Sequence, residues 1–414
     1  MTNKTKTTWL TCLLAIGACL SPLSINAQKR PELAPSPPMG WNSWNWFGPK
    51  ITEAEVVGII DAMAANGLRD AGYKYIVVDG GWREDFLSDK GELLSSSQRF
   101  PRGIKWLAEY AHSKGFKFGL HIVPGRYDCR GNEMGSFGRE EIHLKQFLDW
   151  KLDFIKLDQC WLTRDKPGRG WNPENVHREY TKWSKIFREC GRDIVLSASN
   201  YAFLDWYPAF TNMGRTTPDI QCRWQGGTEF DKGENTKLRR NNNFKSVAEI
   251  ADMNNEYAKH AGAGYWNDPD MMVTGHPELT DEEQKAHVAL WSVMTSPLFL
   301  GNDPRNMTPQ ELALLTNKEI IAVNQDPTEQ GVRIFTLDGA EIWMKKLANG
   351  DAALLLLNRK RAPGEIKVDF EMLGLPGKMY VRDLYNKKDL GRMEEIKAKF
   401  PGRGSMFVRV SRKK

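Results

Sequence analysis

Short apolar runs alternate with amphipathic segments between residues 39 and 301. Each apolar run has the length of a buried strand. The eight runs that predict strands cover residues 39–43, 73–79, 117–123, 154–158, 194–199, 215–220, 264–268 and 297–301. A strand followed by a helix, repeated eight times, predicts a (β/α)8 TIM barrel, an α/β fold in which helices surround a ring of parallel strands.

The clearest helix lies between the first two predicted strands. Thr52 and Glu55 have the spacing of a capping box, and Asn66-Gly67 predicts the end of the helix. The apolar residues between these signals recur at helical spacing, at Val56, Ile59, Ile60 and Met63. This spacing predicts an amphipathic helix.

The pattern changes after residue 327. Short apolar or alternating runs at 332–337, 342–346, 352–357 and 406–410 are separated by Gly, Asn and Asp, which predicts antiparallel strands. We therefore expect a catalytic barrel over residues 35–328 and a C-terminal antiparallel β-sandwich domain over residues 329–414. Nothing in the second domain suggests catalysis, so we expect it to have an accessory role.

Composition agrees with two domains and excludes other classes of protein. A chain of 414 residues is longer than one hydrophobic core usually supports. Apolar residues make up 41% and charged residues 27%, which excludes a disordered or collagen-like chain. The formal charge is +6, and it falls to +4 (56 basic minus 52 acidic residues) without Lys4 and Lys6 of the leader described next. This small charge indicates no nucleic acid partner.

The first 27 residues are typical of an export signal. Lys4 and Lys6 precede an apolar stretch at residues 9–20, and small residues lead to Ala27, where cleavage is expected. This stretch is too short to span a membrane, and no other apolar run reaches the roughly 18 residues that a spanning helix needs. Because residues 16–19 loosely resemble a lipoprotein box, a lipid anchor on Cys19 is the alternative. The sequence predicts an exported protein, periplasmic or extracellular, and leaves its oligomeric state open.

Two aspartates are the main candidates for chemistry. Asp158 and Asp219 each end a predicted strand, and each has a basic neighbour, Lys156 and Arg215. The carboxyl ends of barrel strands face one shared cavity. Two carboxylates in one cavity can cleave a glycosidic bond. For each aspartate taken alone, the alternative is a capped turn or a buried ion pair.

Four cysteines remain after the leader, in a compartment that is oxidising. Cys129 and Cys160 both follow predicted strands, and a disulfide between them would fix the rim of the cavity near Asp158. The alternative is that both are unpaired buried thiols. Cys190 and Cys222 have no informative spacing. The chain has no Cys-x-x-Cys and no His-Glu-x-x-His motif, so we expect no zinc site.

Four motifs resemble those of a known enzyme family, in the same order. They are Met39-Gly40-Trp41-Asn42-Ser43-Trp44, Lys156-Leu157-Asp158-Gln159-Cys160, Trp266-Asn267-Asp268-Pro269-Asp270-Met271, and Asn317-Lys318-Glu319 followed by Asn324-Gln325-Asp326-Pro327. From about Pro35 onward, the chain resembles the family 27 glycoside hydrolases, which are α-galactosidases and α-N-acetylgalactosaminidases. The resemblance implies a retaining exo-glycosidase that cleaves terminal α-galactosidic linkages by double displacement, without a cofactor. It assigns Asp158 as the nucleophile and Asp219 as the acid/base.

The resemblance also implies a sugar pocket. Trp44 is expected to face the apolar side of the sugar ring, and charged groups are expected to bind its hydroxyls. These groups are Asp79, Lys156, Arg215 and Asp270. Lys156 should also keep Asp158 ionised, whereas Asp219 must carry a proton at the working pH. We expect no metal site at Asp268 and Asp270, because the loop around them lacks further acidic ligands.

Two departures from the family pattern concern how galactose is held. Residues 79–82 read Asp-Gly-Gly-Trp where galactosidases usually have Asp-Asp-Cys-Trp, so a sugar-binding carboxylate is missing at Gly80 and a disulfide partner at Gly81. His121, a further pocket residue, stands where a tyrosine is usual. We therefore expect galactose to be bound differently, or another sugar to be bound.

A third departure concerns the 2-position of the sugar. Ser199 and Ala202 resemble the small pair of α-N-acetylgalactosaminidases, which leaves room for an acetamido group. That activity is one alternative, and β-L-arabinopyranosidase and isomalto-dextranase, both of the same family, are two others. A more distant alternative is an inactive barrel that only binds sugar.

Overall fold

The computed structural model describes residues 30–160, 162, 172–225 and 244–413. The predicted export signal over residues 1–27, including Cys19, lies outside the described residues.

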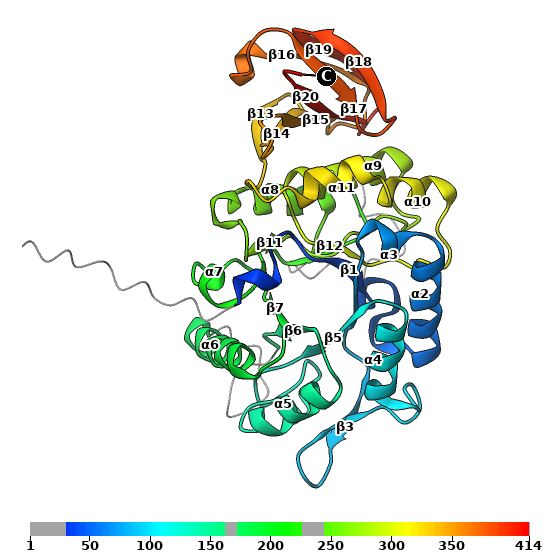
Figure 1. The fold of residues 1–414 in the computed structure, drawn as a ribbon, viewed down its shortest axis with the longest axis vertical. Coiled ribbons are helices and arrows are strands. Elements are labelled where there is room, and N and C mark those ends of the chain that lie inside the picture. The colour runs from blue at the N-terminus through cyan, green and yellow to red at the C-terminus, as the bar shows by residue number, and fades with distance from the viewer. Residues whose placement is uncertain (1–29, 161, 163–171, 226–243, 414) are drawn as a thin grey trace, which may run out of the picture.

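Eight parallel strands form one curled sheet in the larger part of the molecule (Figure 1). Their order around the sheet is β11-β8-β7-β6-β5-β2-β1-β12. Their bounds are β1 Met39–Asn42, β2 Tyr75–Val78, β5 Lys117–Ile122, β6 Phe154–Asp158, β7 Val195–Ser199, β8 Met213–Arg215, β11 Trp266–Asp268 and β12 Leu298–Leu300. Beyond β11, the Met272 N–H donates to the Phe299 carbonyl (2.7 Å) and the Met272 carbonyl accepts from the Gly301 N–H (2.8 Å). These bonds join the two ends of the sheet, and the predicted barrel is confirmed.

Side chains alternate between two cores along the barrel strands. On β2, Tyr75 and Val77 belong to a small cluster inside the barrel, whereas Ile76 and Val78 belong to the large cluster under the helices. Both faces are buried, which is why the strands of a helix-covered parallel sheet are continuous apolar runs.

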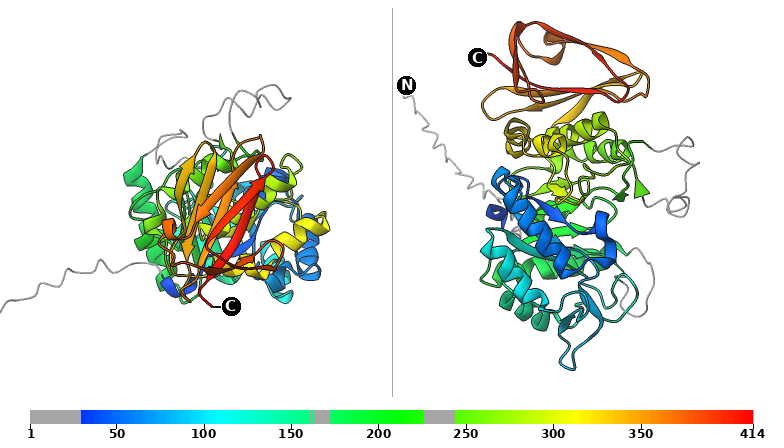
Figure 2. Two further views of the ribbon diagram at one scale, coloured as in Figure 1. Left: turned by 90° about the horizontal axis from the view of Figure 1, so that it is seen from above. Right: turned by 90° about the vertical axis from the view of Figure 1, so that its right-hand side faces the viewer.

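Helices cover the outside of the barrel (Figures 1 and 2). α2 (Glu53–Ala65) is the helix expected between the first two strands: Thr52 and Glu55 form its capping box, and its four predicted apolar residues are buried. Gly67 follows α2 at a φ of 89°, as expected for a residue that ends a helix. Among the described residues, the other α-helices are α1 Trp44–Phe47, α3 Leu68–Ala71, α4 Gly103–Ser113, α5 Glu140–Asp149, α6 Pro173–Glu189, α7 Tyr207–Phe210, α8 Val247–Asn255, α9 Asp281–Val293, α10 Pro309–Leu315 and α11 Lys318–Gln325.

One predicted strand was placed wrongly. The sequence analysis expected the sixth barrel strand at residues 215–220, with Asp219 at its end, but β8 ends at Arg215. Asp219 lies on the two-residue strand β9 (Asp219–Ile220), which pairs with β10 (Phe244–Lys245) outside the barrel sheet. Pro218 explains the difference, since proline has no N–H to donate to a central strand.

An antiparallel unit follows the barrel, at the top in Figure 1. Six strands form one sheet in the order β13-β14-β15-β20-β17-β18, and β16 pairs with β19. Their bounds are β13 Val332–Leu337, β14 Ala340–Lys346, β15 Ala352–Asn358, β16 Gly364–Asp369, β17 Met379–Asp383, β18 Lys388–Met393, β19 Glu395–Phe400 and β20 Ser405–Ser411. The four predicted runs correspond to β13, β14, β15 and β20. The other four strands were not predicted; three of the six residues in each of β18 and β19 are charged, so neither strand contains an apolar run.

Strand β15 connects the cores of the two units. All seven of its residues are buried. Leu355 and Leu357 pack in the same cluster as Trp291 of α9, whereas Leu354 and Leu356 belong to the cluster within the antiparallel unit. Each buried leucine stabilises the fold by roughly 1.5–3 kcal/mol, so this run holds the antiparallel unit against the barrel.

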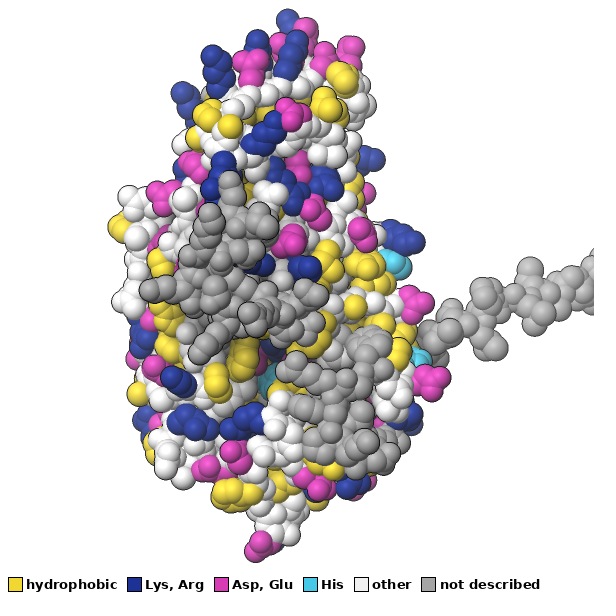
Figure 3. Space-filling model, turned by 180° about the vertical axis from the view of Figure 1, so that it is seen from behind, with side chains coloured by type: hydrophobic (Ala, Val, Ile, Leu, Met, Phe, Trp, Pro, Cys, Tyr) yellow, Lys and Arg dark blue, Asp and Glu magenta, His cyan; other side chains and the backbone are white. Residues whose placement is uncertain are grey.

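The surface carries charges of both signs. On the face shown in Figure 3, basic and acidic side chains are mixed, most densely over the antiparallel unit at the top. None of the helices among the described residues combines the length and the apolar character that crossing a bilayer requires.

Candidate active site

The candidate residues from the sequence line one cavity of about 1110 Å³ at the carboxyl ends of the barrel strands. All ten proposed site residues and both cysteines of the proposed disulfide belong to its lining. They are Trp44, Asp79, His121, Lys156, Asp158, Ser199, Ala202, Arg215, Asp219 and Asp270, with Cys129 and Cys160. The fold thus brings together residues that are up to 226 positions apart, from 44 to 270.

Asp79 and Lys156 form a buried ion pair on one side of the cavity. The Lys156 ammonium lies 2.8 Å from Asp79 Oδ2, which also accepts a hydrogen bond from Asn42 Nδ2 (3.0 Å). The backbone N–H of Gly80 donates to Asp79 Oδ1 (2.8 Å). Burial opposes the charge of Asp79, but Lys156 and then His121 hold the pKa of this carboxyl well below its usual range. Burial also opposes the charge of Lys156, yet Asp79 raises its pKa, so both groups stay charged.

Asp158 is an anion at the end of β6. Its Oδ1 accepts from the Cys160 N–H (2.9 Å), and its Oδ2 accepts from the Ser199 hydroxyl (3.3 Å) and lies 3.4 Å from His121 Nε2. Burial alone would raise the pKa of Asp158, but His121 and then Lys156 bring it below the usual value. The sequence analysis assigned this effect to Lys156, whereas His121 makes the larger contribution.

Arg215 holds two carboxylates on the opposite side. Its Nη2 lies 3.0 Å from Asp270 Oδ2 and 3.1 Å from Asp219 Oδ1. Asp270 Oδ2 also accepts from the Ile220 N–H (2.9 Å). The backbone of Asp270 has a φ of 91°, in the left-handed region that non-glycine residues rarely occupy and that functional sites often contain.

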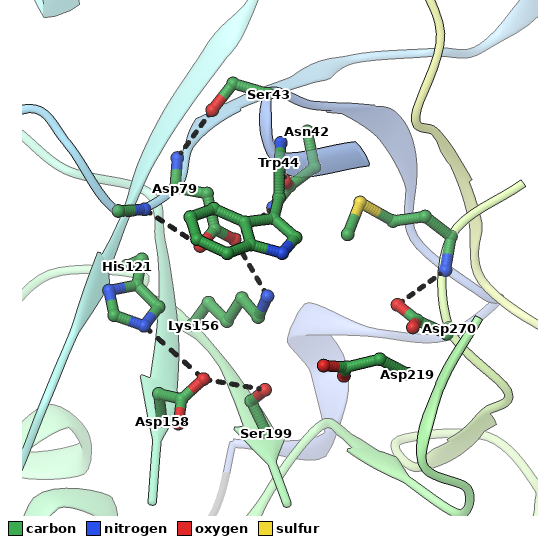
Figure 4. Close-up of polar contacts among 12 residues, drawn as sticks. Asn42, Ser43, Trp44, Asp79, His121, Lys156, Asp158, Ser199, Asp219 and Asp270 are labelled. Atoms are coloured by element: carbon green, nitrogen blue, oxygen red, sulfur yellow. Dashed lines mark hydrogen bonds and ion pairs between the residues drawn. The ribbon is translucent and has the colours of Figure 1, made fainter. Parts of the chain in front are cut away.

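Asp219 has the opposite protonation tendency to Asp158. Burial, the largest influence, raises the pKa of Asp219 to about 6; Arg215 lowers this pKa, and Asp270 raises it further. Figure 4 shows the carboxyl groups of Asp158 and Asp219 turned toward the same open space, with Lys156 and Trp44 on its upper side. One carboxylate that stays ionised and one carboxyl group that keeps a proton are the pair that acid-assisted displacement requires.

The two glycines after Asp79 occupy different environments. Gly80 lines the cavity, and a Cβ atom there would lie 3.3 Å from the indole ring of Trp44. Gly81 has a φ of 104°, and a Cβ atom there would lie 2.5 Å from the Pro49 carbonyl oxygen. A cysteine at position 81 would therefore require a shift of the backbone.

The predicted disulfide is present at the rim. Cys129 and Cys160 are bonded, with their Cα atoms 4.8 Å apart.

Ala202 is exposed on the cavity wall, but the hydroxyl of Ser199 is occupied by its hydrogen bond to Asp158. Of these two small residues, Ser199 at the end of β7 and Ala202 in the loop after it, Ala202 is therefore the one that leaves free space.

The sequence analysis missed several lining residues. Tyr201 is 38% exposed beside Ala202, and Cys222 and Glu278 lie on the wall beyond Asp219. No motif surrounds these residues, and only the spatial arrangement of their loops identifies them.

Two family models together match nearly the whole described chain. The model of the family described as "Alpha galactosidase A" matches residues 36–326, and the model described as "Alpha galactosidase C-terminal beta sandwich domain" matches residues 338–410. The chain is 36% identical over 362 residues to alpha-galactosidase 2 of Arabidopsis thaliana, a match that covers 86% of this chain and 83% of the relative.

Two solved structures share the fold along nearly their full length. Alpha-galactosidase I from Mortierella vinacea has a TM-score of 0.81 and 28% identity, over 91% of this chain and 97% of that one. A family 27 β-L-arabinopyranosidase from Geobacillus stearothermophilus has a TM-score of 0.78 and 25% identity, over 92% and 98% of the two chains.

Proposed function

This chain belongs to the α-galactosidase A family of glycoside hydrolases, and on this premise we propose that it removes terminal α-linked galactose from oligo- or polysaccharides with retention of configuration. The observation that carries the proposal is the pair of carboxyl groups in one cavity with opposite pKa shifts. Asp158 is held ionised, and Asp219 retains a proton to about pH 6.

In the first step, Asp158 attacks the anomeric carbon while Asp219 passes its proton to the glycosidic oxygen. The bond to the leaving group breaks, and a glycosyl ester forms on Asp158. Asp219, now a carboxylate, takes a proton from water as the water oxygen attacks the same carbon. The ester bond breaks, Asp158 is released, and two inversions give net retention.

The buried ion pairs supply fixed partners for the sugar hydroxyls. Lys156 beside Asp79 and Arg215 beside Asp270 each offer a charged donor and a charged acceptor within one pair. Charge-assisted hydrogen bonds from such groups are about twice as strong as those between neutral groups. Trp44, 40% exposed, presents an aromatic face to the apolar side of the ring.

The test is hydrolysis of nitrophenyl α-galactoside, α-N-acetylgalactosaminide, β-L-arabinopyranoside and α-glucoside by the wild type, Asp158→Ala and Asp219→Asn. We expect turnover of the galactoside by the wild type and a loss of several orders of magnitude in Asp158→Ala. ¹H NMR of the first sugar released should show the α anomer. Release of the β anomer would contradict the double displacement, and activity that survives in Asp158→Ala would contradict the role of Asp158.

The other substrates of the panel test the other activities of the family. Preference for the acetamido sugar would indicate that Ala202 opens the 2-position, and preference for the glucoside would indicate an isomalto-dextranase-like activity. Sugar binding without turnover, unchanged in Asp158→Ala, would indicate a barrel that only binds sugar.

Gly80 favours a second candidate activity, on β-L-arabinopyranosides. This sugar differs from galactose only by lacking the hydroxymethyl group, and Gly80 provides no side chain to bind such a group. One small group contacted in a pocket changes kcat/KM by roughly 10–200-fold. A ratio of kcat/KM for galactoside over arabinopyranoside near one would show that the hydroxymethyl group is not recognised, and a ratio below one would favour this second candidate.

We also propose that the chain is exported and that residues 35–328 form the catalytic unit. The disulfide between Cys129 and Cys160 supports export, because disulfides persist in oxidising compartments. The mass of the mature protein from the native host tests both versions of export: cleavage after Ala27 gives the bare chain, and cleavage before Cys19 gives a lipid-modified one.

A further inference from the structure

Three potential metal ligands that the mechanism above does not use lie together beside the catalytic residues. Cys222 follows β9, and His276 and Glu278 lie in the loop between β11 and α9. A ligand atom of each, thiol sulfur, imidazole nitrogen and carboxylate oxygen, lies within 4.8 Å of the other two. Cys222 and Glu278 line the cavity that contains Asp219. We propose that this triad is a binding site for a zinc-class divalent metal ion, with Zn²⁺ as the first candidate.

His276 is oriented as a metal ligand. Its side chain is 7% exposed, and its Nε2 lies 2.9 Å from the Gly301 carbonyl oxygen. Because a carbonyl only accepts, Nε2 carries the proton and Nδ1 keeps its lone pair. Nδ1 lies 3.9 Å from Glu278 Oε2, too far for a hydrogen bond. A ligand histidine whose second nitrogen donates to a backbone carbonyl is the usual arrangement around zinc.

The spacing of the ligand atoms requires a small adjustment. Two ligands at about 2.0–2.3 Å from a tetrahedral zinc ion lie roughly 3.3–3.8 Å apart. The ligand atoms, which lie within 4.8 Å of one another, must therefore approach by at most about 1.5 Å. The Glu278 side chain is 55% exposed, so it can move without disturbing the core, while buried His276 remains fixed.

The charges of the triad match a divalent ion. At neutral pH a free cysteine side chain is mostly a thiol, with its proton on the sulfur. Zn²⁺ binding would form the sulfur–zinc bond and release that proton to solvent. One thiolate, one carboxylate and a neutral imidazole then balance the charge of the ion, with a fourth position open to water or a sugar hydroxyl.

No zinc site was expected from the sequence, because the chain lacks the short-spaced ligand motifs Cys-x-x-Cys and His-Glu-x-x-His. Here the ligands are 54 and 56 residues apart, from 222 to 276 and 278, and only the fold joins them. The ligand set also predicts selectivity, since Ca²⁺ and Mg²⁺ prefer six or more oxygen atoms and bind thiols poorly.

The test measures metal binding to the full chain without substrate, with the disulfide intact, so it does not depend on the hydrolytic activity. Isothermal titration calorimetry with Zn²⁺ at neutral pH, in two buffers of different ionisation enthalpy, should give one ion per chain and about one proton released. Co²⁺ should produce a thiolate-to-cobalt charge-transfer band in the near ultraviolet. Excess Ca²⁺ should displace neither ion.

Two variants and a matched control decide the outcome. Cys222→Ser should lose the charge-transfer band and weaken Zn²⁺ binding at least tenfold, and Glu278→Gln, which changes an exposed side chain, should weaken it by a similar factor. Cys190→Ser removes the other free thiol of the described residues, which donates to the Phe187 carbonyl oxygen (3.1 Å), and this variant should bind Zn²⁺ like the wild type. Absence of Zn²⁺ binding by the wild type, or unchanged binding by Cys222→Ser, would overturn the proposal.

Discussion

Hydrolysis of substrates with poor leaving groups should decrease steeply above pH 6, because the proposed acid, Asp219, must be protonated to act. With its pKa at about 6, the protonated fraction is half at pH 6, about one tenth at pH 7 and about one hundredth at pH 8. The proposed nucleophile acts in the opposite sense. Asp158 must be ionised, and its lowered pKa places the acidic limb below pH 3.8.

The assay is the pH profile of kcat/KM, which reports the free enzyme and therefore matches the ligand-free cavity. Raffinose or melibiose should show the full basic limb, because a sugar alkoxide cannot leave without a proton. Nitrophenyl galactoside should show a weaker limb, since nitrophenolate needs little assistance from an acid. The matched variant is Asp219→Asn, which should abolish the basic limb for both substrates.

A second variant tests the cause of the raised pKa. Asp270→Asn removes a negative charge that raises the pKa of Asp219, and it leaves Arg215 to pair with Asp219 alone. Both effects favour the ionised form, so the basic limb should move down by about one pH unit or more, whatever the loss in absolute activity. A wild-type limb above pH 8, or a limb that does not move in Asp270→Asn, would refute the reasoning.

Three further substitutions have defined outcomes. His121→Gln should move the acidic limb of kcat/KM to higher pH, because His121 makes the largest contribution to the lowered pKa of Asp158; an unchanged limb would contradict this. Gly81→Ala should lower the free energy of unfolding in denaturant by about 2 kcal/mol or more, since its Cβ would lie 2.5 Å from the Pro49 carbonyl oxygen at a positive φ. Burial lowers the pKa of Lys345 from 10.5 in the unfolded chain to about 8 in the folded one. Between pH 8 and pH 10.5 the lysine is still charged in the unfolded chain but mostly neutral in the folded one, so the free energy of unfolding of the wild type should rise as the pH rises through this range. Lys345→Met should lose that rise, and parallel stability curves for the two proteins would show that Lys345 is not its source.

Features set by neighbouring residues were predictable from the sequence. Thr52 and Glu55 cap α2 through contacts three residues apart, and the barrel strands are apolar because both of their faces are buried. The eight-strand repeat then placed Asp158 at a strand end, where the structure has it. The position of Asp219 was misjudged because Pro218 ends the pairing and a separate two-residue strand carries this carboxyl group.

Features set by contacts between distant segments were not predictable. The register of β5 and β6 places His121 opposite Lys156, so the histidine reaches Asp158 from the neighbouring strand. The sequence shows His121 only as an unusual residue in the pocket. The loops that carry Cys222 and His276 meet only in the folded chain, and no local pattern marks them.

The arrangement of charges explains why two chemically identical side chains can have different roles. Asp79 is neutralised by Lys156, and Asp270 by Arg215, each within a buried pair at 3.0 Å or less. Arg215 contacts both Asp270 and Asp219, and its pairing with Asp270 weakens the stabilisation that it can give to an anion on Asp219. Asp158 lies near His121 and also accepts from two hydrogen-bond donors that no other carboxylate of the site shares, the Ser199 hydroxyl and the Cys160 N–H. Asp219 therefore ionises less readily than Asp158, and the proton that it keeps is the one that the proposed mechanism passes to the leaving group.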